Sequence, residues 1–300
     1  MVNLQAICRF NIATSFPESQ PTATYSELSQ LSGISESDVR RIVRGALTNH
    51  VFQEKEPGKV SHTAASRYLA NNKLARQWVE MCVGEMLPAG VNLVKAMEKW
   101  PDSTEMTQTG FCLANNTDKP AFDYVAQFPE RSERFGNAMT LMSREPGFGP
   151  EALLDYFASS GLTAGTLVDI GGSHGAYSIP LVRRFHGLRA IIQDQADVVE
   201  TGRKSLPEDV QGRVEFIAHD FLNEQTVQAD VYLLRWILHN WPDKYCVRIL
   251  RALIPALRPG ARIVINEWIV PEPHQSLPQE QAAVRYVQCL SFLKVTNYKS

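Results

Sequence analysis

One short stretch near the middle of the chain constrains the fold more than any other. The apolar run 167–170 contains a single acid, Asp169, and leads directly into a glycine turn over 171–175. A helical pattern begins after the turn and extends over 176–185. A strand, a tight glycine turn and a helix start, in this order, allow a ligand to approach bare backbone N–H groups. The stretch therefore predicts a ligand-binding loop at the end of a strand.

Around this loop, the second half of the chain alternates short apolar runs with helical patterns. Such alternation implies an α/β fold with a parallel sheet that helices cover on both faces. Ligands of such sheets bind at the carboxyl ends of the strands, near the point where the strand order reverses. The expected strands are 166–170, 189–194, 213–218, 230–236 and 262–270, and the expected helices are 176–186, 196–204 and 243–257.

The spacing of the glycine turn narrows the class of ligand. Ser173 stands where a dinucleotide fingerprint has its middle glycine, so the G-x-G-x-x-G pattern is absent. Asp194 ends the second strand, where a carboxylate can accept both ribose hydroxyls. Asp220 and Phe221 end the third strand and suit an adenine amine and a ring face, and Asp169 can anchor an ammonium group directly or through water. A tight turn with helix-capping acids is the structural alternative, but acids at three successive strand ends favour an adenosine with an amino-acid tail.

The end of the fourth strand supplies a candidate base. Of the seven histidines, His239 alone combines a strand-end position with aromatic neighbours and with a candidate orienting acid, Glu267, at the end of the next strand. A neutral imidazole within hydrogen-bond reach of a substrate hydroxyl can act as general base. A His–Glu pair would fix the tautomer and favour the imidazolium once it forms. A free phenol has a pKa of about 10, so such assistance is useful at neutral pH.

The N-terminal part predicts a winged helix. A short helix over 25–33 is followed by a second one, capped by Ser35 or Ser37, and then by a hairpin about 57–58 and a helix capped by Thr63. Such a module binds DNA or forms dimers. DNA binding depends on neutralisation of the phosphates by positive charge. Three arginines of this part favour DNA binding, and the neighbouring acids oppose it. The enzyme-like second half of the chain favours dimerisation. The arginines are Arg40, Arg41 and Arg44, and the acids are Glu27, Glu36, Asp38, Glu54 and Glu56.

Two further helical stretches, 73–100 and 120–142, lie between these regions, with a loop-like segment between them. The first carries a methionine-rich apolar stripe, which consists of Trp78, Met81, Val83, Met86, Leu87, Val91, Val94 and Met97. Such a stripe is usually core, but it could also form the wall of a pocket for a flat substrate, because methionine adapts to irregular shapes. One more helix is expected over 151–159.

Composition argues against several classes of protein. The net charge of −2 gives no reason to expect a polyanionic partner, and no apolar run reaches the roughly 18–20 residues of a membrane helix. The N-terminus lacks the compact apolar core of a signal peptide. The five cysteines are scattered without a CxxC pair, which indicates a cytoplasmic protein with reduced thiols and no metal knuckle.

Taken together, these motifs resemble the class I S-adenosylmethionine-dependent O-methyltransferases of the plant caffeate and flavonoid type, and more closely still their fungal secondary-metabolite branch. The resemblance extends from about residue 4 to about residue 275. The matching stretches are 4–13, His62-Thr63, 111–120, Asp169-x-Gly-Gly, Asp194, Asp220-Phe221, Arg235-Trp236 and 239–243.

The resemblance implies a Rossmann-like methyltransferase domain over residues 101–300, with its sheet core at 165–270, preceded by a winged-helix dimerisation domain over residues 1–100. It implies a homodimer that takes S-adenosyl-L-methionine and a small aromatic acceptor, without nucleic acid, membrane or metal. The implied cofactor-binding residues are Asp169, Gly171, Gly172, Gly175, Asp194, Asp220, Phe221 and Arg235. The implied catalytic residues are His239 as base and Glu267 as its partner, and the implied pocket residues are Phe135, Met139 and Trp236.

Departures from the family pattern keep a second class of function open. The family continues past Val270 to a second acid beside the histidine and then to an antiparallel hairpin, whereas here 279–295 can form one helix and these C-terminal strands are expected to be missing. The fifth strand would then be an unprotected edge. Asn240 stands where many relatives have an aspartate, and the family usually has a longer N-terminal arm. The chain could therefore be a related protein without methyl transfer, either a pseudoenzyme or a cyclase-type catalyst that uses bound cofactor for electrostatics.

Overall fold

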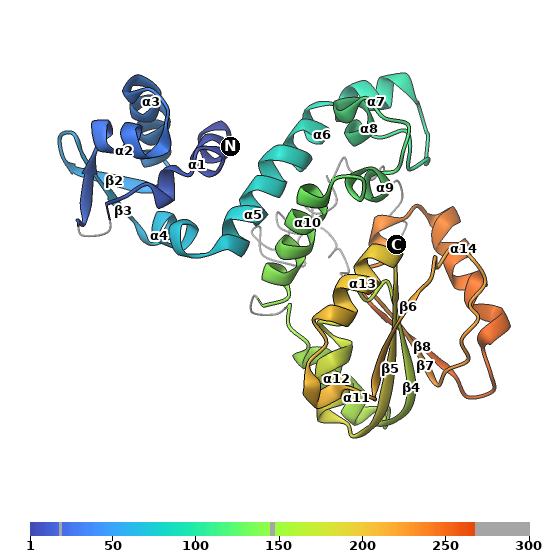
Figure 1. The fold of residues 1–300 in the computed structure, drawn as a ribbon. Helices are drawn as coiled ribbons and strands as arrows, with labels where there is room; N and C mark the ends of the chain where they lie inside the picture. The colour runs from blue at the N-terminus through green and yellow to red at the C-terminus, as the bar shows by residue number, and fades with distance from the viewer. Residues whose placement is uncertain (18–19, 145–147, 268–300) are drawn as a thin grey trace, which may run out of the picture. The chain divides into compact units, whose positions relative to one another are not determined.

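A computed structural model describes residues 1–17, 20–144 and 148–267. The chain forms two compact units (Figure 1): the first joins Met1–Lys99 to Thr109–Met142, and the second joins Trp100–Gln108 to Ser143–Ser300. This division differs from the single boundary expected near residue 100. The physical reason is that helix α10 (Pro129–Met142) packs along helix α5 (Lys73–Met81), which ties 109–142 to the N-terminal residues.

The N-terminal part of the first unit contains the expected helix-turn-helix and hairpin. The strands form an antiparallel sheet in the order β1-β3-β2. Strand β1 is an addition to the predicted elements, because three residues are too few to show a period. The elements are α1 (Val2–Arg9), η1 (Ile12–Thr14), β1 (Thr22–Thr24), α2 (Tyr25–Ser32), α3 (Glu36–Leu47), β2 (Phe52–Glu56), β3 (Lys59–His62) and α4 (Ala64–Asn71).

Side-chain caps begin the helices of this part. Thr24 and Thr63 form capping boxes at α2 and α4. Ser35, and not Ser37, caps α3, because its hydroxyl accepts a hydrogen bond from the Asp38 N–H at 3.1 Å. Each cap satisfies an N–H group that has no partner within the helix and is worth about 1 kcal/mol.

The rest of the first unit is helical, and the structure divides both long helices that the sequence predicts. Residues 73–100 become α5, a π-helical turn η2 (Cys82–Met86), α6 (Leu87–Val91) and α7 (Leu93–Lys99). Residues 120–142 become α9 (Ala121–Val125) and α10. Helix α8 (Gly110–Asn115) lies in the segment predicted as loop.

The methionine-rich stripe is core only at its beginning. Met81 is buried, with 1% of its surface exposed, whereas Val91, Val94 and Met97 are each more than half exposed. The core interpretation therefore holds for the α5 end of the stripe, and a pocket role for the remainder stays a prediction.

The second unit is built on a parallel five-stranded sheet in the order β6-β5-β4-β7-β8, which confirms the predicted α/β fold (Figure 1). The strand order reverses between β4 and β7, so the crevice that favours ligands lies where these strands end. The strands are β4 (Ala164–Ile170), β5 (Gly187–Asp194), β6 (Val214–Ala218), β7 (Val231–Arg235) and β8 (Arg262–Asn266). The helices are α11 (Glu151–Ser159), α12 (Ser178–Arg184), α13 (Ala196–Lys204) and α14 (Asp243–Leu253), with short turns η3 (Glu208–Val210), η4 (Leu238–Asn240) and η5 (Ile254–Ala256).

Helices cover both faces of this sheet, as a parallel sheet requires. Alternate residues of β4 enter different cores: Leu167 packs with α11, α12 and α13, whereas Val168 and Ile170 pack with α14. The expected end of the last strand at residue 270, the helix over 279–295 and the missing C-terminal strands all lie outside the described residues. Among the helices of the described residues, none is long and apolar enough to cross a membrane.

Candidate active site

The glycine turn follows β4 and requires its glycines for two reasons. Gly171 and Gly175 have φ angles of 65° and 79°, which residues with side chains rarely adopt. A Cβ on Gly172 would lie 2.5 Å from the Asp169 carboxyl carbon, and a Cβ on Gly175 would lie 2.5 Å from Ile192 Cδ1. The turn therefore rests directly on the ends of β4 and β5, and its backbone forms a cradle with no room for side chains.

Asp169 lies beneath this cradle with 3% of its surface exposed. Burial raises the pKa of its carboxyl group to about 6; the Asp194 charge adds to the rise, and a short hydrogen bond donated by the Ser178 hydroxyl opposes it. A buried carboxylate whose charge is only partly compensated gains most from a cation placed beside it. The geometry therefore suits an ammonium group over Asp169.

Asp169→Asn is expected to stabilise the free protein at neutral pH while weakening cofactor binding. The unfolded group ionises at about 3.8 and the folded group at about 6, so the folded state loses stability as pH rises between these values. Above pH 6 the ionised carboxylate lowers the free energy of unfolding by on the order of 3 kcal/mol, and the amide variant removes this loss. Denaturant unfolding at pH 4 and pH 8 measures this, since only the pH 8 free energy should increase. Equal stability of the two proteins at both pH values would contradict it.

Asp194 ends β5 and holds the glycine turn from the side. Its Oδ2 accepts a hydrogen bond from the Ser173 N–H, and its Oδ1 accepts one from the Gln195 N–H, both at 2.8 Å. Burial raises the pKa of this carboxyl group, and the two N–H bonds lower it. Because Ser173 has a positive φ of 51°, the bond from its N–H also fixes the turn. Asp194 therefore has a structural task beside any contact with a ribose.

Asp220 and Phe221 follow β6, and Phe221 reaches the glycine turn. A Cβ on Gly171 would lie 3.5 Å from the Phe221 ring, and that ring packs edge-on against Trp241 with centroids 5.6 Å apart. Asp220 accepts a hydrogen bond from the Leu222 N–H at 2.9 Å, which shapes the loop. Trp241 is not among the residues predicted for the site, although its place directly after His239-Asn240 could have indicated it.

His239 and Glu267 form the pair expected from the sequence. His239 Nδ1 lies 2.6 Å from Glu267 Oε2, and the two side chains are 21% and 15% exposed. Glu267 also has a task that sequence reasoning missed: its Oε1 accepts hydrogen bonds from the N–H groups of Ile237 and Leu238 at 2.8 and 2.7 Å. One carboxylate thus orients the imidazole and holds the turn that carries it.

Arg235 ends β7, and aromatic rings enclose its guanidinium group. The Cζ atom lies 3.4 Å from the Tyr177 ring centroid and 3.8 Å from that of Trp236, and Nη2 donates to the Phe148 carbonyl at 3.2 Å. Burial lowers its pKa to about 10. Its Nε is buried and makes no hydrogen bond within the described part of the chain. Sequence reasoning missed Tyr177, for which an aromatic residue two positions after Gly175 was the only signal.

The three predicted pocket residues fall in different units. Trp236 lies beside His239 in the second unit, with ring centroids 6.2 Å apart. Phe135 and Met139 lie on α10 of the first unit, where the Phe135 ring packs edge-on against Phe122. The structure thus brings Trp236 to the candidate base, and the pocket role of the other two stays a prediction. In the described residues, no group of three or more His, Cys, Asp or Glu side chains could hold a metal ion.

Comparison with known proteins gives related sequences over most of the chain. The grayanic acid biosynthesis cluster O-methyltransferase of Cladonia grayi is 41% identical over 91% of this chain, and O-methyltransferase kk1A of Curvularia clavata is 39% identical over 94%. The chlorophenol O-methyltransferase of Trichoderma longibrachiatum is 36% identical over 90%. The chain spans 57%, 66% and 59% of the lengths of these relatives, respectively.

Solved structures share the fold. The mitomycin 7-O-methyltransferase MmcR has a TM-score of 0.80 at 23% identity, covering 98% of this chain and 83% of that one. A variant of LepI, solved in complex with SAH and a substrate analogue, has a TM-score of 0.78 at 23% identity, covering 98% of this chain and 76% of that one. Residues 107–292 match the O-methyltransferase domain family. With this match and relatives of 34–41% identity from fungi, the chain belongs to the O-methyltransferase family.

Proposed function

We propose that the protein is an S-adenosylmethionine-dependent O-methyltransferase that methylates a phenolic hydroxyl of a small aromatic secondary metabolite. The observation that carries this proposal is that one edge of one sheet holds both the glycine cradle and the His239–Glu267 pair. The similarity to a chlorophenol O-methyltransferase supports a phenolic acceptor, and the similarity to a biosynthesis-cluster enzyme supports a secondary metabolite.

The residues at the glycine turn fit this cofactor. Because Gly172 and Gly175 carry no side chain, the turn packs closely on Asp169 and Ile192 and leaves its backbone bare toward a ligand. In our proposal Asp169 holds the ammonium group, and the buried Arg235 Nε, a donor without a partner in the described residues, faces the carboxylate of the same amino-acid tail. Asp194 and Asp220 take the ribose hydroxyls and the adenine amine, and Phe221 packs against the adenine ring.

His239 performs the proton transfer in this mechanism. When bound, the cofactor supplies an electrophilic methyl group on a sulfonium sulfur. Glu267 accepts a hydrogen bond from His239 Nδ1, so the neutral imidazole keeps Nε2 free to accept a proton. Nε2 would take the proton of the acceptor hydroxyl, the acceptor oxygen would receive the methyl group as the carbon–sulfur bond of the cofactor breaks to leave a thioether, and Glu267 would stabilise the resulting imidazolium. Because the reacting charges neutralise each other, the chain contributes mainly by positioning.

Calorimetric titration with S-adenosylmethionine tests the cofactor site. Asp194→Asn keeps an acceptor oxygen for the Ser173 N–H but removes the charge that the ribose hydroxyls would meet, so affinity should fall by about 10- to 100-fold. Glu200→Gln is the matched control, because Glu200 is an exposed acid on the neighbouring helix α13, where it pairs with Arg203 and Lys204. Absence of binding to the unmodified chain would refute the proposed function, and unchanged affinity of Asp194→Asn would refute this residue's role.

A related protein without methyl transfer is the alternative that the sequence left open. It would share the cofactor site, so titration alone does not separate the two. The 2.6 Å contact between His239 and Glu267 favours methyl transfer, since a purely electrostatic use of bound cofactor has no need of an oriented base.

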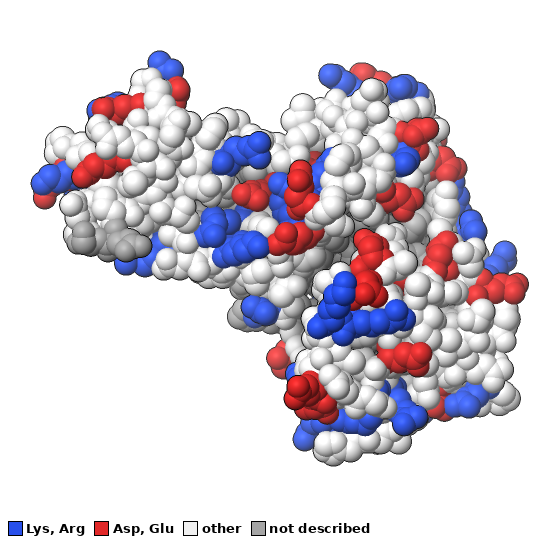
Figure 2. Space-filling view, in the orientation of Figure 1, with Lys and Arg blue, Asp and Glu red and all other residues white. Residues whose placement is uncertain are grey.

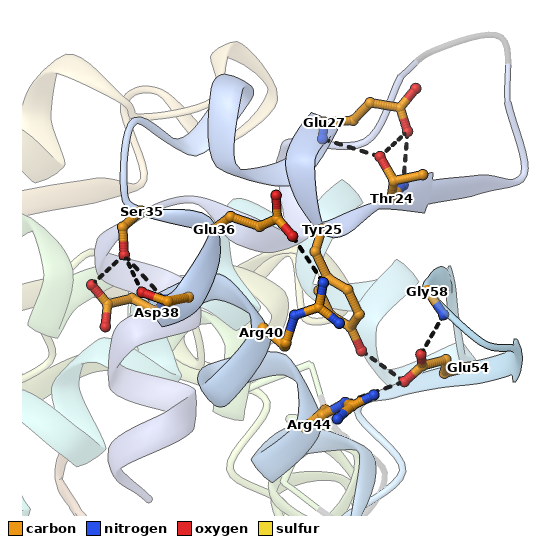
Figure 3. A network of polar contacts seen from close by, with 11 residues as sticks. Thr24, Tyr25, Glu27, Ser35, Glu36, Asp38, Arg40, Arg44, Glu54 and Gly58 are labelled. Carbon is orange, nitrogen blue, oxygen red and sulfur yellow. Dashed lines mark hydrogen bonds and ion pairs between the residues drawn. The ribbon is translucent and has the colours of Figure 1, made fainter.

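The winged-helix part favours a role as a dimerisation module over DNA binding. Each of the three arginines of α3 has an acid beside it. Arg40 pairs with Glu36 at 2.8 Å and Arg44 lies 3.8 Å from Glu54 (Figure 3), and Arg41 lies 3.7 Å from Asp38. Arg40 also lies over the Tyr25 ring. Over this part, the face in Figure 2 shows basic side chains next to acidic ones. These pairs leave little positive charge for phosphates, which disfavours nucleic-acid binding. Of the two roles of such a module, we therefore propose the other, the formation of a homodimer.

A further inference from the structure

Ring contacts lead from the proposed base to a residue that has no role in the mechanism so far. The His239 ring packs edge-on against Trp236, with centroids 6.2 Å apart and planes at 73°. The Trp236 ring packs edge-on against Phe148, with centroids 5.6 Å apart and planes at 81°. All three residues are partly exposed. The second unit therefore presents aromatic surface that begins at the imidazole and ends at Phe148.

Trp236 is held in a conformation that a bulky residue rarely adopts. Its φ angle is 56°, and left-handed backbone at such a residue costs on the order of 1–3 kcal/mol. Its N–H donates to the Asn266 carbonyl at 3.1 Å, and Arg235 stacks on its ring. Strain of this kind persists only where the surroundings fix it, and it is typical of functional sites. It indicates that the direction of the Trp236 ring matters for function.

Two hydrogen bonds hold the backbone of Phe148 beside Tyr177 and Arg235. Its carbonyl accepts one hydrogen bond from the Tyr177 hydroxyl at 2.5 Å and another from Arg235 at 3.2 Å. The Tyr177 and Trp236 rings enclose the Arg235 guanidinium from two sides. The position of Phe148 relative to His239 is therefore set in advance, which lowers the entropy that binding a ligand there would lose.

Building on the proposed function, we propose that Trp236 and Phe148 form an aromatic wall that selects planar acceptors with at least two fused rings. A hydroxyl within hydrogen-bond reach of His239 places its own ring beside Trp236. In our proposal the hydroxyl-bearing ring lies beside Trp236 and a second, fused ring meets Phe148, whose ring contacts that of Trp236. An aromatic contact of this kind changes affinity by about 2- to 12-fold.

Acceptor binding tests this wall separately from catalysis. Affinities for naphthol, with two fused rings, and cresol, with one, are measured by calorimetry with S-adenosylhomocysteine bound. Phe148→Leu should weaken naphthol binding by about 2- to 12-fold and leave cresol and cofactor affinities unchanged. Tyr177→Phe keeps the ring over Arg235 but removes the bond to Phe148, so it should weaken naphthol binding less, with the same selectivity. Tyr156→Leu, an exposed aromatic substitution on α11, is the control and should change neither affinity.

Selective loss of naphthol affinity in Phe148→Leu supports the wall. Equal loss for both acceptors, loss accompanied by weaker cofactor binding, or no loss at all would overturn it. Turnover of the unmodified chain is measured in parallel. Its absence would refute the proposed function while the binding comparison still decides the wall.

Discussion

Replacing His239 with alanine is expected to lower kcat for methyl transfer to a phenol by about 10²–10⁴-fold, the usual contribution of a general base. The affinity for S-adenosylmethionine should be nearly unchanged, because the imidazole lies at the end of β7 and the cradle at the end of β4. His186→Ala, at an exposed histidine of the same unit, is the matched control.

The acidity of the acceptor provides a sharper measurement of the same prediction. A free phenol ionises near pH 10, so the variant's rate should recover as pH rises toward that value. A phenol whose substituents already ionise it at neutral pH should show a much smaller defect, since it needs no base. If the defect of His239→Ala is equal for weakly and strongly acidic phenols, His239 does not act as the base.

Glu267 should respond differently to substitution by alanine and by glutamine. Glu267→Ala leaves the N–H groups of Ile237 and Leu238 and the ring of His239 without their acceptor, and each unsatisfied buried group costs about 1–3 kcal/mol. We expect this variant to lose both thermal stability and activity. Glu267→Gln keeps an oxygen for the two N–H groups but turns an NH2 group toward Nδ1. That places the imidazole proton on Nε2, so stability should persist while kcat falls by about 10²-fold or more.

Thermal unfolding and steady-state kinetics of the two Glu267 variants separate the two tasks of this residue. If Glu267→Gln has the same kcat as the unsubstituted protein, Glu267 only supports the turn. If Glu267→Ala has the same Tm as the unsubstituted protein, the N–H groups of Ile237 and Leu238 do not depend on Glu267.

The parts of the fold that depend on local pattern could be predicted from the sequence. The apolar runs that contain Asp169 and end in Asp194, and the glycines between them, indicated the sheet, its order of elements and the edge where a ligand is expected. The observed division, which joins 109–142 to the N-terminal residues, could not be derived in this way, because it depends on α10 packing along α5 across distant sequence. Helix α8 and strand β1 were also missed, since each is too short to show a period.

In the candidate site too, residues placed by local sequence pattern could be predicted, and contacts between segments far apart in the chain could not. His239 and Glu267 were accessible because each follows a predictable strand end. The cluster of Phe148, Tyr177 and Arg235 was not, because three segments far apart in the chain meet there and none carries a periodic signal. The positive φ of Trp236 was equally hidden, since an aromatic residue gives no warning of left-handed backbone.

Methyl transfer to a phenol can be followed without relying on any single residue assignment. The most direct measurement incubates the full chain with S-adenosylmethionine labelled on its methyl group and a set of one-ring and fused-ring phenols, and follows the label into the acceptor by mass spectrometry. We expect a labelled methyl ether on a phenolic oxygen, formed by the unmodified chain and almost absent with His239→Ala. Tight cofactor binding without transfer of label to any phenol in the set would contradict it.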